Sequence, residues 1–449
     1  MFAPPWSGCE LNKLPMKVLF ISLGCAKNLM DSEQMIALLT AAGHELTDDP
    51  GEAEGAVVNT CAFIDAAQQE AINTILELAE QKKAGPLRRL VVTGCLPQRY
   101  AQSILAELPE IDAVLGTGSF PDIVEALESG EEHFARFADK DAPLPELERA
   151  VSTGPAWAYL KIADGCDNRC AYCVIPSIRG KYRSRPMAAI LAEAAALAES
   201  GVKELILVAQ NLTRYGRDLR NGTTLADLLR ELAKVEGIQW IRLHYLYPHE
   251  ITDELIDVIA GERKIVKYLD IPIQHVNDAI LRRMRRPETR AGIEELFAKL
   301  RARIPEVVIR TSIIVGLPGE GEAELRELMD FLREQRLPRA GVFAFSPQEG
   351  TAAYEMEDRC EPQEAERRRE AVMELQSRIM DEYDRAQLGR VFAVLCEGRE
   401  ADGRWFGRRY ADSPEVDEQV YFTGGAIPGE FVSVRITGAE AGCLTGETV

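Results

Sequence analysis

Residues 166–173 read Cys-Asp-Asn-Arg-Cys-Ala-Tyr-Cys, and this stretch says more about the fold and chemistry of the chain than any other. Its three cysteines, Cys166, Cys170 and Cys173, have the spacing C-x3-C-x2-C. A structural zinc site needs four ligands, and no fourth Cys or His lies close by. Three thiolates suit a [4Fe–4S] cluster that keeps one iron open for a substrate or cofactor. The alternative is a chance group of cysteines or half of a zinc ribbon.

Alternating strand and helix patterns follow on both sides of this stretch. We expect strands at 157–162, 204–209, 240–245, 266–271, 307–315 and 341–345, with helices between them, for example at 188–199 and 293–303. Six βα units over residues 156–387 fit a partial TIM-like barrel, whose chemistry lies at the C-terminal ends of the strands. The cysteine stretch follows the first of these strands, which is the expected place for a site.

The N-terminal part, residues 16–137, has a second alternating pattern. Strands are expected at 17–24, 55–60, 88–94 and 112–115, and helices at 32–42, 66–83 and 98–108. This order predicts a doubly wound parallel sheet. Cys25, Cys61 and Cys95 each follow one of its first three strands, where ligands bind in such sheets. We therefore expect a second site of three thiolates, and buried core cysteines are the alternative.

The remaining segments are a linker, a tail and an N-terminal extension. Residues 138–155 are rich in Pro and acidic residues, which predicts a linker. A charged helix at 363–387 leads to residues 388–449, whose Val, Gly and turn residues predict a small all-β barrel. Residues 1–15 have no periodicity, so we expect an extension or a misassigned start, with Cys9 idle.

The composition fits a cytoplasmic enzyme. Hydrophobic residues make up 46% of the 449 residues and charged residues 28%, and we expect neither a membrane span nor a signal peptide. Ten cysteines are too few for a disulfide scaffold in a chain of this length. A formal net charge of −20 makes nucleic acid a less natural partner, because phosphate binding needs Lys and Arg.

These motifs together resemble a known family. The cysteine triad at 166–173, with Tyr172 before its last cysteine, resembles the signature of radical S-adenosylmethionine (SAM) enzymes. With Ser-Leu-Gly-Cys-Ala-Lys-Asn-Leu-Met-Asp-Ser-Glu at 22–33, Asn-Thr-Cys61 and Thr-Gly-Cys95, the chain resembles the methylthiotransferases over residues 16–449, including a C-terminal TRAM domain. Phrases at 176–186, 243–249, 268–275, 314–320 and 340–351 look like the branch that modifies an aspartate of the small-subunit ribosomal protein uS12.

The resemblance implies two [4Fe–4S] clusters with different tasks. Cys166, Cys170 and Cys173 would hold the cluster that cleaves SAM, and the resulting radical would take hydrogen from the substrate carbon. Cys25, Cys61 and Cys95 would hold an auxiliary cluster that carries the sulfur. One SAM would methylate that sulfur and a second would supply the radical, with electrons from a flavodoxin- or ferredoxin-type donor. Ala26, Leu317 and Gly321 depart from the pattern of this branch, but none of them is an expected ligand.

Eight further residues are candidates for the SAM pocket, and each has a purely structural alternative. Tyr172 could meet the adenine through its backbone, and Gln210 and His275 follow strands of the barrel. Gly316, Pro318 and Gly319 could let the backbone approach the nucleoside. Arg183 and Arg185 could pair with the SAM carboxylate or an acidic substrate. The alternatives are a capping Gln, a core His, turn glycines and a solvated basic surface.

The tail offers a test of the substrate. Residues 389–449 contain six Arg, no Lys and ten Asp or Glu. An RNA-binding barrel normally has a basic surface with aromatic side chains; here Trp405, Phe406, Tyr410, Tyr421 and Phe422 lie near Arg404, Arg408 and Arg409, but acidic residues dominate. A basic loop of uS12 matches this charge better. The alternatives are the sister branch, which modifies adenosine in tRNA and has Gln and Met where this chain has Ala26 and Lys27, and a non-enzymatic iron–sulfur or zinc module on the ribosome.

Overall fold

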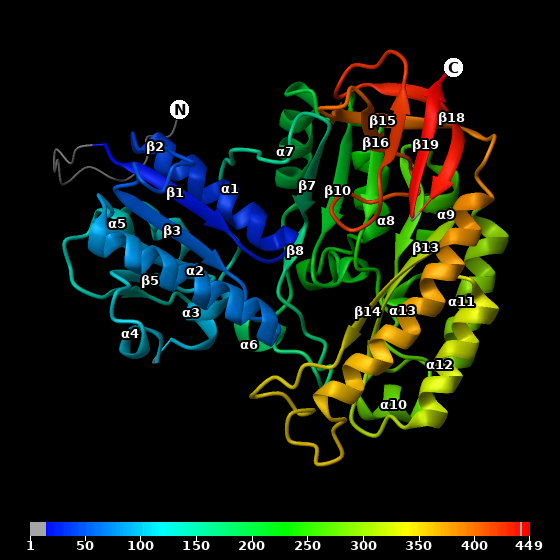
Figure 1. The fold of residues 1–449 in the computed structure, drawn as a ribbon, viewed down its shortest axis with the longest axis horizontal. Coiled ribbons are helices and arrows are strands. Elements are labelled where there is room, and N and C mark those ends of the chain that lie inside the picture. Colours follow the sequence, from blue (N-terminus) through cyan, green and yellow to red (C-terminus); the bar gives the residue numbers. More distant parts are fainter. Residues whose placement is uncertain (1–14, 102, 441) are drawn as a thin grey trace. The chain divides into compact units, whose positions relative to one another are not determined.

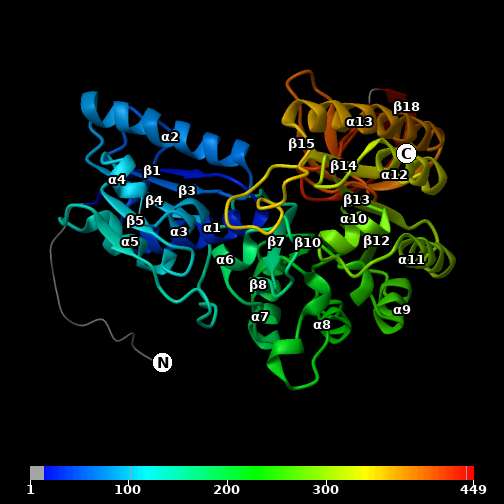
Figure 2. The same cartoon turned by 90° about the horizontal axis from the view of Figure 1, so that it is seen from below.

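The computed structural model describes residues 15–101, 103–440 and 442–449, and Cys9 therefore lies outside the described residues. The chain forms two compact units, one ending at Ala150 and the other running from Val151 to Val449 (Figures 1 and 2). Within the described ranges, every helix is too short or too polar to cross a lipid bilayer.

The first unit contains a parallel sheet in the order β2-β1-β3-β4-β5-β6. The strands are β1 (Lys17–Ser22), β2 (Glu45–Leu46), β3 (Gly55–Thr60), β4 (Arg89–Gly94), β5 (Ala113–Leu115) and β6 (Phe134–Arg136). The helices are α1 (Ala26–Ala41), α2 (Asp65–Ala84), α3 (Cys95–Arg99), α4 (Ile104–Glu107) and α5 (Ile123–Glu128). The strand order reverses between β1 and β3. In doubly wound sheets that switch point is where ligands bind.

This unit confirms the expected doubly wound sheet, but two helices differ from the sequence pattern. The central strands β3 and β4 are buried at every residue, which explains their continuous apolar sequence. Helix α1 begins at Ala26 rather than at residue 32, directly after Cys25. The helix expected at 98–108 is broken, because Tyr100 leaves the helical conformation and its hydroxyl donates to Gln68 Oε1 at 2.9 Å.

Residues 137–156 have no helix or strand, yet their C-terminal part is held against α1. The buried side chain of Arg149 forms an ion pair with the buried carboxylate of Glu33. The Ala150 N–H donates to the Glu33 carbonyl at 3.0 Å, and Leu147 packs on the apolar core of the sheet. Much of the stretch expected as a linker therefore belongs to the first unit.

The second unit is built around six parallel strands that neighbour one another in chain order, β7-β10-β11-β12-β13-β14. They are β7 (Trp157–Lys161), β10 (Glu204–Val208), β11 (Trp240–Leu243), β12 (Ile265–Asp270), β13 (Val308–Val315) and β14 (Arg339–Ala344). The helices are α6 (Ile175–Arg179), α7 (Met187–Glu199), α8 (Leu225–Leu232), α9 (Asp253–Gly261), α10 (Asp278–Arg283), α11 (Arg290–Arg303), α12 (Glu322–Gln335) and α13 (Pro362–Arg385). All six expected strands are present, with bounds within about two residues, and the partial barrel is confirmed.

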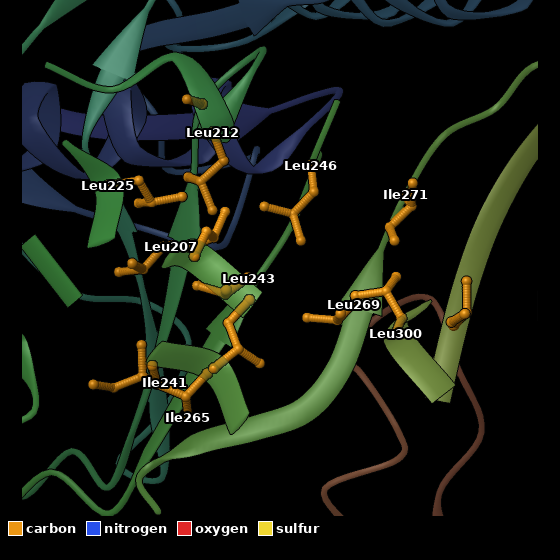
Figure 3. Packing of buried hydrophobic residues seen from close by; sticks show 14 of the residues in the cluster. Leu207, Leu212, Leu225, Ile241, Leu243, Leu246, Ile265, Leu269, Ile271 and Leu300 are labelled. Carbon is orange, nitrogen blue, oxygen red and sulfur yellow. The ribbon is translucent and has the colours of Figure 1, made fainter. Parts of the chain in front are cut away.

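Side chains alternate along these strands between an apolar helix-covered face and a polar inner face. Leu207, Leu243 and Leu269 belong to the main apolar core, which Figure 3 shows together with Leu225 of α8 and Leu300 of α11. Arg242 and Tyr268, one residue away along their strands, lie outside that core. The alternation follows from the two-residue period of a strand.

The last segment forms a closed barrel in the order β15-β16-β17-β19-β18, as expected. Its strands are β15 (Val391–Arg399), β16 (Trp405–Arg408), β17 (Val420–Thr423), β18 (Phe431–Glu440) and β19 (Cys443–Thr448). Figure 1 shows it in orange and red beside the partial barrel.

The loop between β16 and β17 covers the polar inner face of the partial barrel, which the sequence did not suggest. Arg242 Nη1 donates to the Tyr410 carbonyl at 2.8 Å. The hydroxyl of Tyr268 donates to Asp417 Oδ2 at 2.6 Å, and that of Tyr159 to Glu415 Oε2 at 2.8 Å. These bonds join the two barrels into a single compact unit.

Candidate functional site

The cysteine triad lies in the loop that follows β7 and the short strand β8 (Ala163–Asp164). The Cys173 N–H donates to the Cys170 carbonyl at 3.1 Å, and the Cys166 N–H donates to the Gly180 carbonyl at 3.1 Å. Gly165 has φ +80°, and a Cβ at that position would lie 2.0 Å from the Lys181 carbonyl oxygen. Only glycine allows the loop to approach residues 180–181 this closely, and this approach fixes the start of the triad.

The three thiols form a donor set that fits an iron–sulfur cluster. Burial raises the pKa of Cys166 to about 11 and that of Cys173 to about 12, and the neighbouring Cys170 adds to both shifts. Thiolates are therefore unfavourable here unless positive metal ions compensate their charge. Among the described residues, no three His, Cys, Asp or Glu side chains are close enough to hold a single metal ion. Thiolates of a cubane cluster each bind a different iron, so they stand farther apart than the ligands of one ion.

Two residues beside the triad were not singled out in the sequence. The hydroxyl of Tyr247 is 3.5 Å from Cys170 Sγ, and the guanidinium carbon of Arg286 lies 4.2 Å from the centre of the Tyr247 ring. Tyr247 falls in the family phrase at 243–249, but only the folded chain places it beside Cys170. Tyr172 packs on a separate small apolar cluster that includes Met284 and Leu317.

Gln210 lies just after β10 and contacts the loop that precedes the triad. Its Nε2 donates to Asp164 Oδ1 at 2.6 Å, and Arg179 Nη1 donates to Asp164 Oδ2 at 3.0 Å. Burial alone would raise the pKa of Asp164, but the charges of Arg179 and Lys161 outweigh it and hold that pKa well below its usual value. Gln210 Oε1 is buried and has no hydrogen-bond partner among the described residues. An unsatisfied acceptor here fits a ligand that carries N–H or O–H groups, as SAM does.

His275 and Gly316 lie in a different environment, against α13. His275 is completely buried, and its Nε2 is 3.4 Å from Glu320 Oε2. Glu320 Oε1 accepts from the Gly316 N–H at 2.9 Å and from Arg368 Nη1 at 3.1 Å. A Cβ on Gly316, which has φ +77°, would lie 2.5 Å from the Cβ of Ala365. The close contact that requires a glycine at position 316 is therefore a contact with helix α13.

The other pocket candidates also have contacts within the fold. Pro318 is buried, and the Gly319 N–H donates to the Asp358 carbonyl at 3.1 Å. Arg185 is buried, and its Nη1 donates to Glu193 Oε2 at 2.6 Å and to the Lys161 carbonyl at 2.8 Å. Arg183 is half-buried, and its Nη2 donates to the Arg179 carbonyl at 2.8 Å.

The second group of cysteines lies at the carboxyl edge of the sheet in the first unit. Cys25 follows β1, Cys61 follows β3 and Cys95 follows β4, and these three strands are neighbours. Cys61 and Cys95 are buried, whereas Cys25 is exposed. A Cβ on Gly24 would lie 3.2 Å from Cys61 Sγ, so the loops after β1 and β3 touch. Cys25 and Cys61 thus border the switch point of the sheet and Cys95 follows the next strand, so that the three thiols can converge on one ligand.

Asn28 of α1 connects the loops that carry these cysteines. Its side chain is completely buried, and its Nδ2 donates to the Leu23 carbonyl at 3.0 Å and to the Thr60 carbonyl at 2.8 Å. The thiol of Cys95 lies 3.7 Å from Asn28 Oδ1. One amide therefore holds all three loops. No role could be predicted for Asn28 from the sequence, because its partners lie up to 67 residues away.

Three known families match separate parts of the chain. Residues 17–116 match the family described as "Uncharacterized protein family UPF0004", residues 160–332 the radical SAM superfamily and residues 388–449 the TRAM domain.

Curated relatives match almost the entire chain. "Ribosomal protein uS12 methylthiotransferase RimO" of Lachnoclostridium phytofermentans is 48% identical over 438 residues, covering 96% of this chain and 99% of the relative. The protein of the same name from Anaeromyxobacter sp. (strain Fw109-5) is 47% identical, covering 96% of this chain and 93% of the relative.

Among solved structures, the radical SAM methyltransferase TsrM of Kitasatospora setae is similar in fold. Its complex with tryptophan and a SAM analogue has a TM-score of 0.53 and 16% sequence identity, covering 72% of each chain. At that identity the likeness concerns the fold alone.

Proposed function

The chain belongs to the RimO family of radical SAM methylthiotransferases, and we propose that it adds a methylthio group to the β carbon of an aspartate in ribosomal protein uS12. The observation that carries this proposal is the 48% identity, over 96% of the chain, to a relative named for that reaction. The expected similarity to methylthiotransferases and the expected fold are confirmed by these matches.

We assign the two triads of cysteines to two [4Fe–4S] clusters. Cys166, Cys170 and Cys173 would hold the cluster that binds SAM, and Cys25, Cys61 and Cys95 the auxiliary cluster. When bound, these clusters and two SAM molecules supply the electron, the radical, the sulfur and the methyl group. Fixed loops and burial of the thiols support the first assignment, and the position of Cys25, Cys61 and Cys95 at the ends of three neighbouring strands supports the second.

The residues around the first triad would orient SAM rather than react with it. Gln210 can accept a hydrogen bond from SAM through its unsatisfied Oε1, while Asp164 holds its amide in place. Tyr172 sits on an apolar cluster beside the triad, which would exclude water from the radical. His275, Gly316, Pro318, Gly319, Arg183 and Arg185 remain predictions, and their observed contacts lie within the protein itself.

The charge of the TRAM barrel favours a basic protein substrate over RNA. Arg408 and Arg409, which the sequence placed near a possible RNA-binding surface, are buried. Arg408 Nη2 is 2.7 Å from Glu204 Oε2, and Arg409 Nε is 2.8 Å from Asp412 Oδ2. These two arginines are therefore unavailable to phosphates. We infer that nucleic-acid contact is secondary and that a basic segment of uS12 is the better match for the acidic surface.

We also propose an electron donor and a cellular location for the reaction. A flavodoxin- or ferredoxin-type protein would supply the electrons, because SAM cleavage consumes one electron from a reduced cluster. The enzyme would act in the cytoplasm, where its ribosomal substrate is found.

Mass spectrometry after anaerobic turnover tests the proposal. The reconstituted enzyme, with SAM, sulfide and a reductant, is offered small ribosomal subunits and unmodified tRNA in parallel. A gain of one methylthio group on a uS12 aspartate alone is expected. A gain on tRNA adenosine would keep the chemistry and overturn the substrate. Cys443→Ala serves as the control, because Cys443 lies in the TRAM barrel and belongs to neither triad.

A further inference from the structure

A tyrosine hydroxyl faces one sulfur of the SAM-binding triad. Tyr247 lies beyond the end of β11, and its N–H donates to Thr213 Oγ1 at 3.2 Å, which anchors its backbone. Its hydroxyl is 3.5 Å from Cys170 Sγ. A cysteine that binds iron has no proton to give, whereas a phenol is an O–H donor at neutral pH. With the cluster bound, Tyr247 is therefore the donor of this hydrogen bond.

A buried cation lies behind that tyrosine. Arg286 follows α10 and is only 4% exposed, and its guanidinium carbon lies 4.2 Å from the centre of the Tyr247 ring. Its Nη2 donates to the Pro272 carbonyl at 2.8 Å, and its Nε is 3.1 Å from Glu288 Oε2. Glu288 is shared with His249, whose Nδ1 is 3.1 Å from Oε1. Arginine cannot lose its charge. Glu288 offsets part of that charge, but the guanidinium rather than the carboxylate lies against the Tyr247 ring, so the positive end of the ion pair faces the tyrosine.

One-electron reduction adds a negative charge to a cluster, and nearby groups decide how much that charge costs. Hydrogen bonds to cluster sulfurs, net charge and solvent exposure set the reduction potentials of iron–sulfur clusters. Water screens the charge of Arg286 only weakly in this buried position, and stacking on the ring holds the guanidinium beside Tyr247. Both groups therefore stabilise the reduced cluster more than the oxidised one.

We propose that Tyr247 and Arg286 are positioning residues that raise the reduction potential of the SAM-cleaving cluster, through a hydrogen bond to Cys170 and a buried positive charge behind it. The proposal rests on the assignment of that cluster to the first triad. It goes beyond that assignment by saying which residues make the cluster reducible.

The test is a redox titration of the cluster, followed by electron paramagnetic resonance. The full-length enzyme carries Cys25→Ala, Cys61→Ala and Cys95→Ala, so that only the SAM-binding triad holds a cluster. Tyr247→Phe and Arg286→Gln are compared with Arg282→Gln, which removes an exposed arginine of α10, the helix that precedes Arg286.

Both variants should shift the midpoint potential to more negative values. A hydrogen bond is stronger to the more negative, reduced cluster than to the oxidised one, so its loss should change the equilibrium between the two about tenfold. For one electron this equals about 59 mV. The shift of the double variant should be smaller than the sum of the two, because Arg286 acts through the Tyr247 ring.

Three outcomes would separate the possible failures. A Tyr247→Phe potential equal to that of Arg282→Gln, at normal iron content, would overturn the proposal. Loss of iron from Arg286→Gln with an unchanged potential in Tyr247→Phe would mean that these residues only support the fold. A parent enzyme that binds no cluster would instead refute the cluster assignment under the proposed function.

Discussion

Replacement of Asn28 by leucine should weaken the auxiliary cluster site without creating a cavity in the core, since the two side chains are similar in size. The substitution leaves the carbonyls of Leu23 and Thr60 without their donor, at 3.0 and 2.8 Å in the native protein. An unsatisfied buried polar group costs about 1–3 kcal/mol. Because Leu23 is only half-buried, we expect a total of about 2–4 kcal/mol. If this free energy is needed to bring the three cysteine loops together, the affinity for the cluster drops roughly 30- to 700-fold.

The assay is iron content after anaerobic reconstitution, measured against increasing concentrations of a chelator. The full-length enzyme carries Cys166→Ala, Cys170→Ala and Cys173→Ala, so that iron reports only on the auxiliary site. Asn73→Leu is the matched control, because Asn73 is exposed on α2 and remote in sequence from every cysteine loop. If Asn28→Leu retained iron as tightly as this control, Asn28 would not be the residue that holds the loops together.

Three further changes test other parts of the structure. Cys61→Ala should still release 5′-deoxyadenosine from SAM but transfer no sulfur, as measured by chromatography and mass spectrometry; a fully active variant would contradict the two-cluster assignment. Glu204→Gln leaves the buried Arg242 without its carboxylate and Arg408 with Glu397 alone, and should lower the free energy of unfolding by about 3–5 kcal/mol in urea, whereas the exposed Glu231→Gln should change little. Burial raises the pKa of Asp412, but Arg409 outweighs it and holds that pKa at about 2, below its unfolded value. The stability that Asp412 contributes is thus present above about pH 4 and lost as the pH falls towards 2. The Asp412→Asn variant should lack this pH-dependent contribution to stability. If the stability of the variant and of the native protein depended on pH in the same way, the contribution of Asp412 would be excluded.

The strands of both parallel sheets could be predicted because the burial of a strand produces a recognisable pattern in its own sequence. Strands β3 and β4 are buried at every residue, so their sequences are continuously apolar. The edge strands β2 and β6 have only two and three residues, too few for a period to emerge. The early start of α1 and the break at Tyr100 depend on contacts with other segments, and propensity alone does not record them.

Both triads of cysteines could be proposed from the sequence, one from its C-x3-C-x2-C spacing and the other from its positions after predicted strands. The residues that surround these cysteines in the folded protein could not be predicted. Asn28, Tyr247 and Arg286 meet their cysteine partners only after the chain has folded, across separations of 67, 77 and more than 100 residues. A sequence pattern shows that such residues exist but not which groups they will face.

The TRAM tail shows the same division most clearly. Its composition alone gave the small barrel and its acidic charge. Only the tertiary structure revealed that Arg408 and Arg409 are buried against carboxylates instead of facing RNA. The sequence by itself determined the type of each element and the spacing of the thiols, because these depend on neighbours along the chain. Which charges are paired, which remain exposed and which groups surround each thiol was decided by tertiary packing, because the partners come from distant segments.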